Sequence, residues 1–600
     1  MAASPAPHVV LFPVPGQGHV NPFMAIAEFL AAHGITVTFV HTRRSYAVLT
    51  SASSPNLQTL NHHHHHPTAS HSDEKNGGCI RIEVVPDAMP ADLKQKISSD
   101  HLVASMPLMR EGLESLLRRL MAVDPNPKNL SQPPPPSCLI ADSFMPWSHD
   151  VAVQFKLPRI QVWTSSAAVF SMGYHIPTLL QRGFGFGSGF GFTNPSSSSS
   201  CSSHEYLQEI VDFLPGISPL RVADLPQEFQ TPTFPFFASL FEHCEDAERI
   251  LVHTLYELEK PTIDALRECA GGDLRISTFM TSKYTYNGGN NNNNNNINKN
   301  NNNNININNN KNNKNNNNNI NNNNNNRNGA LEDHDAMAPV KSAIISSSST
   351  SLLPEDESCL AWLAAQEEAS VLYIAFGSLH GVSEAVLHDL AMAVEASGVK
   401  FLWVLRADQT KLDSRDNERN GEKEEEEKKK NTTTTGPVAL PQGFVERTKE
   451  RGLVISWAPQ RDVLAHKSVA AFLTHCGWNS VLESLSNGVP MLAYPLGGEQ
   501  NTNLKYLVQD WGVALPLVDP FSPSPSPGAM SSSDPTVMER AIRTIMKPEG
   551  EEMSRLKSRA LHWKQVSIDS TSPPNGASVA DLLTLVHDLK HGALKFEMKG

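Results

Sequence analysis

The stretch that decides the fold runs from Trp457 to Gln500 and reads WAPQRDVLAHKSVAAFLTHCGWNSVLESLSNGVPMLAYPLGGEQ. The hydrophobic pattern predicts strands at Val454 to Ser456 and at Ala470 to Thr474, with a helical turn at Arg461 to His466 between them. After the second strand, His475 to Asn479 forms a polar turn into another helix. A strand, a polar turn and a helix start in this order are typical of a parallel α/β sheet, whose ligand sites lie at the ends of the strands.

The predicted helix start after His475 has the properties of an anion site. The first N–H groups of a helix have no partner within the helix and lie at the positive end of its dipole, so a diphosphate can bind there without a lysine. His475, Asn479 and Ser480 add side-chain donors. An Asn-Ser pair alone is also an ordinary helix cap. The whole 44-residue stretch favours a nucleotide-sugar site instead.

Almost position by position, this stretch resembles the signature box of the plant family 1 UDP-sugar glycosyltransferases, including its length. The resemblance implies that Trp457 stacks on the uracil, that Gln460 bonds its edge and that Glu483 accepts from the ribose hydroxyls, which suits a flat ring and a bidentate carboxylate. It also implies diphosphate contacts at the helix start. The UDP-sugar-binding residues that the resemblance implies are Thr164, Ser378, Trp457, Ala458, Gln460, His475, Gly477, Trp478, Asn479, Ser480, Glu483, Glu499 and Gln500.

The sugar-binding end of the box departs from the family pattern. Trp478, Glu499 and Gln500 would face the sugar, but the box usually closes with Asp-Gln and here closes with Glu499-Gln500. The longer acid keeps the charge and moves it by about one methylene, so the implied sugar contact shifts. A closing Gln rather than His favours glucose by resemblance. By the same resemblance Ser378 would contact the phosphates and Thr164 would reach the transferred sugar.

The rest of the chain repeats the βαβ pattern of a parallel sheet twice. In the first half, an apolar run at His8 to Val14 precedes a predicted helix at Pro22 to His33 and a strand at Thr36 to His41. In the second half, Ser370 to Phe376 and Phe401 to Leu405 read as strands around a helix at Ser383 to Ser397. These patterns predict two Rossmann-like, doubly wound domains that face a central cleft, which by resemblance is the GT-B fold.

His19 and Asp142 are the candidate catalytic pair. Transfer of a sugar to a hydroxyl needs a base that accepts the proton of the acceptor. His19 is expected in the loop after the first strand, and Asp142 follows the apolar strand Cys138 to Ala141. In a parallel sheet both would lie at the same crevice, where an Asp behind a His fixes its tautomer and stabilises the imidazolium. The segments GHVNP and CLIADSF resemble the same family, in which this pair is the catalytic dyad.

Low-complexity segments separate the predicted units. Residues 1–280 are expected to form the acceptor-binding domain, 281–340 an Asn-rich linker, 341–585 the UDP-sugar-binding domain and 586–600 a tail. Low-complexity segments cannot bury enough apolar surface to become ordered. The insertions read in this way are the loops 61–78, with its five-histidine run, and 183–204, the charged insertion 407–436 and the Ser/Pro-rich loop 521–534.

Composition narrows the function class and the compartment. A net charge of −13 and a pI near 6.0 give no electrostatic footprint for nucleic acid. The seven scattered cysteines lack CxxC spacing, which argues for reduced thiols and against a zinc site or a disulfide framework. No signal peptide or membrane-spanning segment is expected. The sequence thus predicts a cytoplasmic monomer with a UDP-sugar donor, a small hydrophobic acceptor, no cofactor and no metal.

Three other functions fit parts of the sequence. A catalytically silent UDP-sugar-binding or interaction protein is suggested by the insertions and by Glu499, although His19 and Asp142 speak against it. An epimerase or hydrolase could use the same two-domain plan. A metal-dependent transferase would use the DxD triplet Asp333 to Asp335, but no strand precedes that triplet, which favours solvated linker.

Overall fold

The fold is taken from a computed structural model of the whole chain. The described residues are 7–52, 78–90, 99–122, 133–184, 207–231, 233–269, 275–280, 355–377, 381–405, 440–518 and 534–596. The predicted low-complexity loops, the Asn-rich linker and the DxD triplet lie almost wholly outside them. Residues 1–285 and 342–600 belong to one compact unit, which contains every strand and helix given below.

The first sheet is parallel throughout and has the strand order β3-β2-β1-β4-β5-β8-β9. All side chains of β1, β2, β4, β5 and β8 are buried, as expected where helices cover both faces of a parallel sheet. The strands are β1 (His8–Phe12), β2 (Thr36–Thr42), β3 (Ile80–Val85), β4 (Cys138–Asp142), β5 (Arg159–Trp163), β8 (Arg249–His253) and β9 (Arg275–Phe279).

The second sheet is also parallel, with the order β12-β11-β10-β13-β14-β15. Its central strands are buried along their whole length. The strands are β10 (Val371–Ala375), β11 (Lys400–Val404), β12 (Gly452–Ile455), β13 (Val469–Thr474), β14 (Met491–Ala493) and β15 (Ala514–Pro516). A short antiparallel pair, β6 (Ile210–Val211) and β7 (Leu220–Arg221), completes the described strands.

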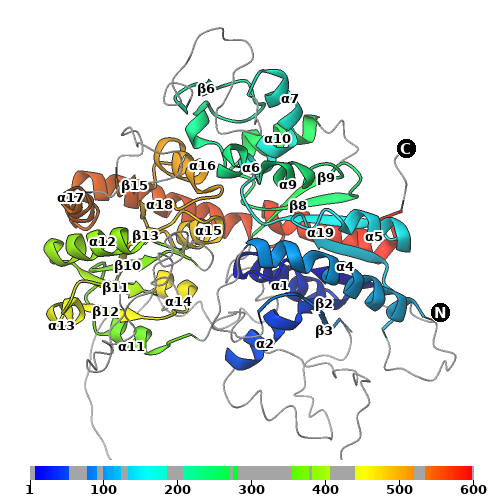
Figure 1. Cartoon of the computed structure of the whole chain (residues 1–600), viewed down its shortest axis with the longest axis horizontal. Coiled ribbons are helices and arrows are strands. Elements are labelled where there is room, and N and C mark those ends of the chain that lie inside the picture. The colour runs from blue at the N-terminus through cyan, green and yellow to red at the C-terminus, as the bar shows by residue number, and fades with distance from the viewer. Residues whose placement is uncertain are drawn as a thin grey trace, which may run out of the picture. The chain divides into compact units, whose positions relative to one another are not determined.

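Helices flank both sheets, as Figure 1 shows for α1, α4 and α5 beside the first sheet and for α12 and α17 beside the second. The helices before residue 281 are α1 (Gln17–Ala32), α2 (Arg43–Ala52), α4 (Ser99–Met121), α5 (Ser148–Phe155), α6 (Ala167–Tyr174), α7 (Ile176–Gln181), α9 (Phe234–Ser239) and α10 (Lys260–Cys269), with 3₁₀ turns η2 (Val222–Asp224) and η3 (Gln227–Gln230). The later helices are α11 (Ser358–Ala364), α12 (Glu384–Ser397), α13 (Phe444–Thr448), α14 (Gln460–Ala465), α15 (Trp478–Asn487), α16 (Gln500–Lys505), the π-helical turn η6 (Tyr506–Asp510), α17 (Pro535–Ile545), α18 (Glu551–Ser570) and α19 (Ala577–His591).

The predicted strands and helices match the observed ones to within a few residues, except at the start of α1. That helix begins at Gln17, so His19 lies in its first turn and not in a loop. Pro22 lies inside α1, although it was the expected first helical residue. Because proline has no N–H, the Gly18 carbonyl four residues earlier receives no helical hydrogen bond from it, and Asn479 Nδ2 donates to this carbonyl at 2.7 Å.

The strand order reverses once in each sheet at a point that matters for function. In the first sheet, β1 lies between β2 and β4, and in the second, β10 lies between β11 and β13. The chain leaves neighbouring strands toward opposite sides at such a point, which opens a crevice beyond the carboxyl ends of the strands. His19 follows β1 and Asp142 ends β4, whereas Gly377 follows β10 and His475 follows β13.

The last helix, α19, packs against β9 of the first sheet, so the chain returns to the fold of its first half. The predicted domain end at 585 falls inside this helix, and the predicted tail 586–600 includes its last turns; this boundary was wrong. Asp588 of α19 accepts hydrogen bonds from the buried Arg249 at 2.6 Å and from Arg275 at 2.9 Å. The remaining domain limits stay a prediction.

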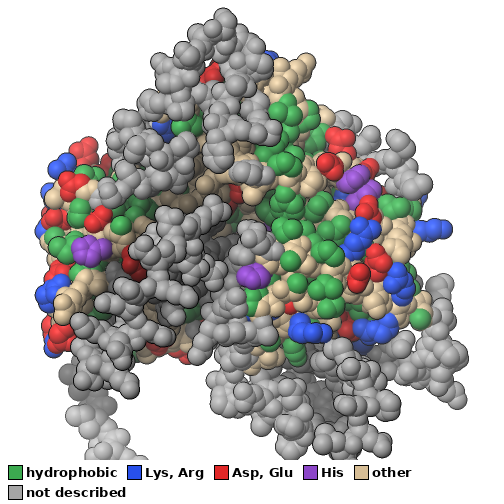
Figure 2. All heavy atoms as spheres, in the orientation of Figure 1, with side chains coloured by type: hydrophobic (Ala, Val, Ile, Leu, Met, Phe, Trp, Pro, Cys, Tyr) green, Lys and Arg blue, Asp and Glu red, His purple; other side chains and the backbone are tan. Residues whose placement is uncertain are grey.

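Figure 2 shows Lys and Arg side chains scattered singly or in small groups among Asp and Glu on the visible face. Among the described residues on that face, the basic side chains form no continuous patch.

Replacing Asp588 with Ala should destabilise the protein by about 3–5 kcal/mol, because it leaves the charge of Arg249 buried without its partner. The measurement is the urea midpoint of unfolding. Asp264→Ala is the matched control, since the Lys260–Asp264 pair is exposed at both side chains and should contribute about 0–1 kcal/mol. Equal midpoints for the two variants would show that α19 is not anchored by this pair.

Candidate active site

A histidine and a buried carboxylate meet at the reversal point of the first sheet. His19 Nδ1 lies 2.8 Å from Asp142 Oδ2. Asp142 has no exposed surface, and the backbone N–H groups of Val14 and Phe144 donate to its two oxygens at 3.1 and 3.0 Å. The sequence prediction that these two side chains share one crevice is confirmed as a matter of geometry.

The contact with Asp142 fixes the tautomer of His19. An ionised carboxylate only accepts hydrogen bonds, so Nδ1 carries the proton and Nε2 keeps its lone pair. Thr164 Oγ1 lies 3.0 Å from the same Nδ1, and the ring of Phe144 meets the imidazole edge to face at 5.1 Å. The His19 ring is therefore held in one orientation, with Nε2 as the atom that can accept a proton.

The electrostatic surroundings favour protonation of His19. Burial by itself lowers the pKa of His19, but the charge and the hydrogen bond of Asp142, together with the charge of Glu499, outweigh burial and raise that pKa above its usual 6.5. A raised pKa makes the neutral imidazole a stronger base, and the same carboxylates stabilise the imidazolium after proton uptake.

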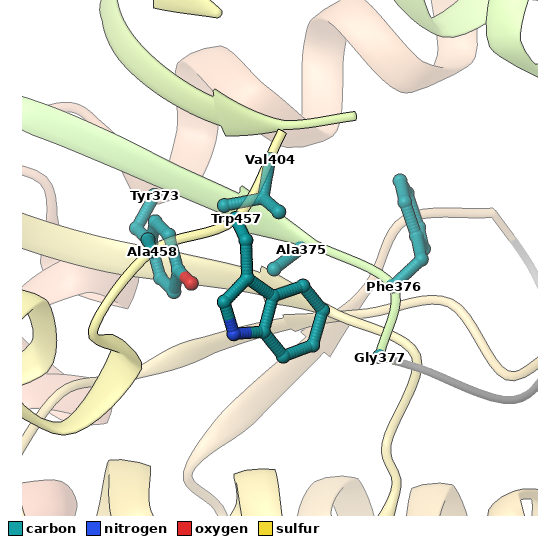
Figure 3. A pocket seen from close by; sticks show the side chains of 7 residues that line it. All are labelled: Tyr373, Ala375, Phe376, Gly377, Val404, Trp457 and Ala458. Carbon is teal, nitrogen blue, oxygen red and sulfur yellow. The ribbon is translucent and has the colours of Figure 1, made fainter. Parts of the chain in front are cut away.

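At the reversal point of the second sheet, a pocket surrounds the indole of Trp457 (Figure 3). The indole stands in the middle of the pocket, between the ends of β10 and β11, which leaves only about 20 Å³ of free volume. The walls come from Tyr373, Ala375, Phe376, Gly377, Val404 and Ala458. A half-buried aromatic ring in an apolar wall is suited to stacking against a flat base.

The side chain of Gln460, at the start of α14, belongs to a hydrogen-bond network beside this pocket. Its Oε1 accepts from the Tyr373 hydroxyl at 3.2 Å. Its Nε2 donates to Ser480 Oγ at 3.0 Å and to Glu483 Oε2 at 2.8 Å. Burial raises the pKa of Glu483, and the bond from Gln460 partly opposes that shift. Gln460 therefore orients a carboxylate and a hydroxyl of α15.

The turn between β13 and α15 brings His475 against two glycines. Cys476 adopts a left-handed conformation with φ of 65°, and Asn503 supports the turn by donating to the Cys476 carbonyl at 2.9 Å. A Cβ atom on Gly377 would lie 2.5 Å from His475 Nε2, and one on Gly477 would lie 2.3 Å from it. Both positions need glycine because the imidazole fills the space that a side chain would take.

The first turns of α1 and α15 lie against each other. Asn479 Nδ2 donates to the Gly18 carbonyl at 2.7 Å, and a Cβ on Gly18 would approach the same Nδ2 to 3.1 Å. Gly477, which caps α15, makes no side-chain cap bond. Two positive helix ends thus meet beside His19 and His475, an arrangement that attracts an anion such as a diphosphate.

Glu499 and Gln500 begin α16 at the edge of the same site. Burial, followed by the charge of Glu228, raises the pKa of the Glu499 carboxyl to about 7, and a hydrogen bond from the Trp478 N–H opposes that shift. Gln500 Oε1 accepts from the N–H groups of Leu496 at 2.7 Å and Gly497 at 3.2 Å. These bonds shape the loop before α16.

The indole of Trp478 does not face a sugar site. Its Nε1 donates to the His253 carbonyl, and the ring packs near Trp511 in the core. The sequence prediction for this side chain was wrong, because a large apolar ring at a helix start is more stable when buried. Only the Trp478 backbone N–H points to Glu499.

Two further observations concern the predicted set. Ser378 lies outside the described residues. Tyr373 and Gln227 were missed: Tyr373 binds Gln460, and Gln227 exchanges hydrogen bonds with Gly498, with its N–H donating at 2.9 Å and its Oε1 accepting at 3.1 Å. The apolar run of β10 indicates that Tyr373 is buried but not which residue its hydroxyl contacts. No local sequence pattern distinguishes Gln227.

Residues 348–546 match the family model described as UDP-glucoronosyl and UDP-glucosyl transferase. The chain is similar along almost its whole length to UDP-glycosyltransferase 85A7 of Arabidopsis thaliana, with 26% identity over 97% of this chain and 96% of the relative. It is also 27% identical to 7-deoxyloganetin glucosyltransferase of Catharanthus roseus, over 98% of this chain and 97% of the relative. These matches support the resemblance to the plant family 1 UDP-glycosyltransferases.

The fold agrees with solved structures of the same type. UGT2 of Phytolacca americana, solved with UDP-2fluoro-glucose and pterostilbene, aligns with a TM-score of 0.60 and 24% identity over 98% of this chain and 99% of that chain. UGT71G1 of Medicago truncatula, solved with UDP-glucose, aligns with a TM-score of 0.61 and 19% identity over 98% of both chains. The two α/β sheets of this glycosyltransferase therefore form the predicted GT-B fold.

The same matches support transfer of a sugar from a UDP-sugar as the general activity of this enzyme. Among the described residues, no helix is both long and apolar enough to cross a membrane. The six cysteines that the structure describes form no disulfide.

Tyr373→Phe should weaken binding of UDP about 2- to 13-fold, because loss of one hydrogen bond of about 0.5–1.5 kcal/mol frees Gln460 to turn away from Glu483. Isothermal titration with UDP measures this change. Tyr256→Phe is the control, since the Tyr256 hydroxyl bonds Asp264 and Lys260 and not the nucleotide pocket. UDP affinity equal to that of the unmodified enzyme in Tyr373→Phe would contradict the positioning role of Tyr373.

Proposed function

We propose that this glycosyltransferase transfers glucose from UDP-glucose to a hydroxyl of a small hydrophobic acceptor, with inversion at the anomeric carbon and without a metal ion. The observation that carries the proposal is the 2.8 Å contact between His19 and Asp142, placed beside the joined starts of α1 and α15. A base and an anion site thus lie within one crevice, as a single displacement requires.

In this reaction His19 is the base. Its Nε2 takes the proton of the acceptor hydroxyl as the acceptor oxygen bonds to the anomeric carbon, and the bond from that carbon to the diphosphate oxygen breaks. Attack opposite the leaving group inverts the carbon. The carboxylate of Asp142 stabilises the imidazolium that forms, and its two backbone hydrogen bonds keep it in place.

The donor is held by the second sheet. Uracil stacks on Trp457 with Ala458 beside it and bonds Gln460 at its edge, while Glu483 accepts from the ribose hydroxyls. The diphosphate lies at the start of α15, where His475, Asn479 and Ser480 supply donors in addition to the backbone of Gly477 and its neighbours. These roles rest on the helix end and the polar network there, which stabilise negative charge on the departing diphosphate. Ser378 is a further phosphate contact by family resemblance.

The sugar lies between Thr164, Glu499 and Gln500. Glucose is favoured because curated relatives are named 7-deoxyloganetin glucosyltransferase and, in Prunus dulcis, (R)-mandelonitrile beta-glucosyltransferase. The longer side chain of Glu499 brings its carboxylate to the Trp478 N–H, and its charge acts on His19. In this enzyme the sugar-binding acid therefore also tunes the base.

The acceptor is a phenolic, flavonoid, terpenoid or hormone with an apolar body. The segments expected to line its site are Pro86 to Met89, Phe144 to Trp147 and Met172 to Leu180, and Phe144 already contacts the His19 ring. Apolar walls with one placed polar group are typical of sites for such molecules. The enzyme acts as a cytoplasmic monomer in this proposal; the cytoplasmic part of it rests on the scattered cysteines, which lack the spacing of a disulfide framework.

His19→Ala should lower turnover about 10²- to 10⁴-fold on an alcohol acceptor, because general base catalysis contributes on that order. Steady-state kinetics and UDP titration together measure the effect; UDP affinity should not change. Asp142→Asn should give a defect of the same kind, and the double variant should lose little more than His19→Ala alone.

The control for this pair is His33→Ala, since His33 caps the far end of the same helix. With a phenol of low pKa as acceptor, the fall in turnover of His19→Ala and Asp142→Asn should be smaller, because such a phenol loses its proton more readily. Unchanged turnover of His19→Ala on an ordinary alcohol would remove the base from the mechanism.

Glu499→Gln should move the acidic limb of the turnover profile to lower pH. The base must be neutral, so turnover rises with pH through the pKa of His19, which lies above 6.5. Removing the negative charge of Glu499 lowers that pKa, and the rise then begins at lower pH. The measurement is kcat against pH at saturating donor.

Glu483→Gln is the control for the pH profile, because Glu483 is not among the charges that act on His19. This control should weaken donor binding and leave the limb in place. An acidic limb at the same pH in Glu499→Gln and in the unmodified enzyme would mean that Glu499 does not tune His19.

A further inference from the structure

A second cavity lies away from the residues assigned to the reaction. It has a volume of about 300 Å³, and its walls come from α5, the start of β5, the segment before β8 and the end of the chain. None of its lining residues belongs to the Trp457 pocket or to the residues around His19. Three of them, His149, His243 and Asp246, are side chains of the kind that bind metals.

The donor atoms of these three side chains converge. One ligand atom of each lies within 4.8 Å of the others. His243 Nδ1 is 3.0 Å from Asp246 Oδ2, and His149 Nδ1 is 3.9 Å from the same oxygen. The two imidazole rings stack in parallel, with centroids 4.0 Å apart and an interplanar angle of 2°.

We propose that His149, His243 and Asp246 bind one zinc ion, with water at the fourth position, at a site separate from glycosyl transfer. Zinc bonds of about 2.0–2.1 Å in a tetrahedron place neighbouring ligand atoms about 3.3 Å apart. The distances of 3.0 and 3.9 Å lie on either side of that value. Two imidazoles and a carboxylate suit zinc better than magnesium and calcium, which prefer sites made of oxygen ligands.

Binding requires a small rearrangement of the rings. A metal must lie in the plane of each imidazole, and parallel planes share no point, so the rings have to turn about their Cβ–Cγ bonds. The side chains of His149 and His243 are 21% and 43% exposed, which leaves room for this turn. Zinc would therefore replace the ring stack with two directed bonds.

Neighbouring residues support the segment that carries two of the ligands. The buried Arg159 donates from Nη2 to the His243 carbonyl, which fixes the backbone at that ligand. The positive charges of Arg159 and Lys595 oppose binding of a cation, but the carboxylates of Asp246 and Glu248 line the same cavity and balance them. The ion would link α5 to the segment before β8 and so stabilise the part of the first sheet around the starts of β5 and β8.

Other histidines of the chain must be separated from the proposed site. The run His62 to His66 can bind metals by itself and lies outside the described residues. His587 and His591 form a second stacked pair, with centroids 4.1 Å apart, next to Asp588. That carboxylate is already held by Arg249 and Arg275, so the pair offers two ligands and no available acid.

The test uses the full chain with His62 to His66 each replaced by serine, and Zn²⁺ as the probe. Calorimetric titration should give one strong Zn²⁺ site per chain, and Co²⁺ in its place should show the visible absorption of tetrahedral cobalt. His243→Ala and Asp246→Asn, made in this background, should each weaken Zn²⁺ binding at least 10-fold. His587→Ala is the matched control and should leave the strong site intact.

Stability gives a second readout. Zn²⁺ should raise the Tm of the background protein and of His587→Ala but not that of His243→Ala, while the Tm without metal should be similar in all three because both histidines are half-exposed. Glycosyl transfer should survive EDTA. Loss of the strong site in His587→Ala, or its retention in both His243→Ala and Asp246→Asn, overturns the zinc proposal. Loss of glycosyl transfer in EDTA would instead contradict the proposal that the reaction needs no metal. The Zn²⁺ titrations of the variants would still decide whether His149, His243 and Asp246 form the zinc site.

Discussion

The candidate active site depends on the burial of one carboxylate, Asp142. A buried acid is stable in its charged form only where donors replace water, and here the donors are two backbone N–H groups and the imidazole of His19. Val14 follows β1 and Phe144 follows β4, so Asp142 also links the segments that follow these two strands at the reversal point of the first sheet. The same bonds that satisfy the acid set the orientation of the base.

A second constraint is that the site lies between the two sheets and is held by hydrogen bonds across them. Asn479 donates to Gly18, Trp478 to His253 and Thr502 to the Asp224 carbonyl. Each bond ends on a backbone carbonyl of the first half of the chain. A backbone carbonyl can accept a hydrogen bond whatever side chain its residue carries. The half of the protein that binds the UDP-sugar is therefore held in position without restricting which side chains contact the acceptor substrate. Acceptor specificity can therefore vary while the alignment of the two halves is kept.

The sequence predicted the elements whose signals are local. Apolar runs predicted β1, β10 and β13, and the helix predicted at Ser383 to Ser397 is α12. Their position after two parallel strands placed His19 and Asp142 at one crevice. The features that sequence reasoning missed depend on distant partners. The indole of Trp478 is buried through Trp511 and His253, and Tyr373 matters through Gln460, 87 positions away. Periodicity identifies a buried face but not the residue that it meets, so such pairs were not predictable from one sequence.

The return of α19 to the first sheet has a consequence for the order of folding. Arg249 lies in β8, next to the edge strand β9, and pairs with Asp588, 339 positions later in the chain. During synthesis, strands β1 to β9 emerge long before α19, so the guanidinium of Arg249 has no carboxylate partner until α19 has been made. Contacts between such distant segments also slow folding, because a long loop must close before they form. The first sheet therefore receives α19 and completes its buried ion pair only after the second half of the chain has been made.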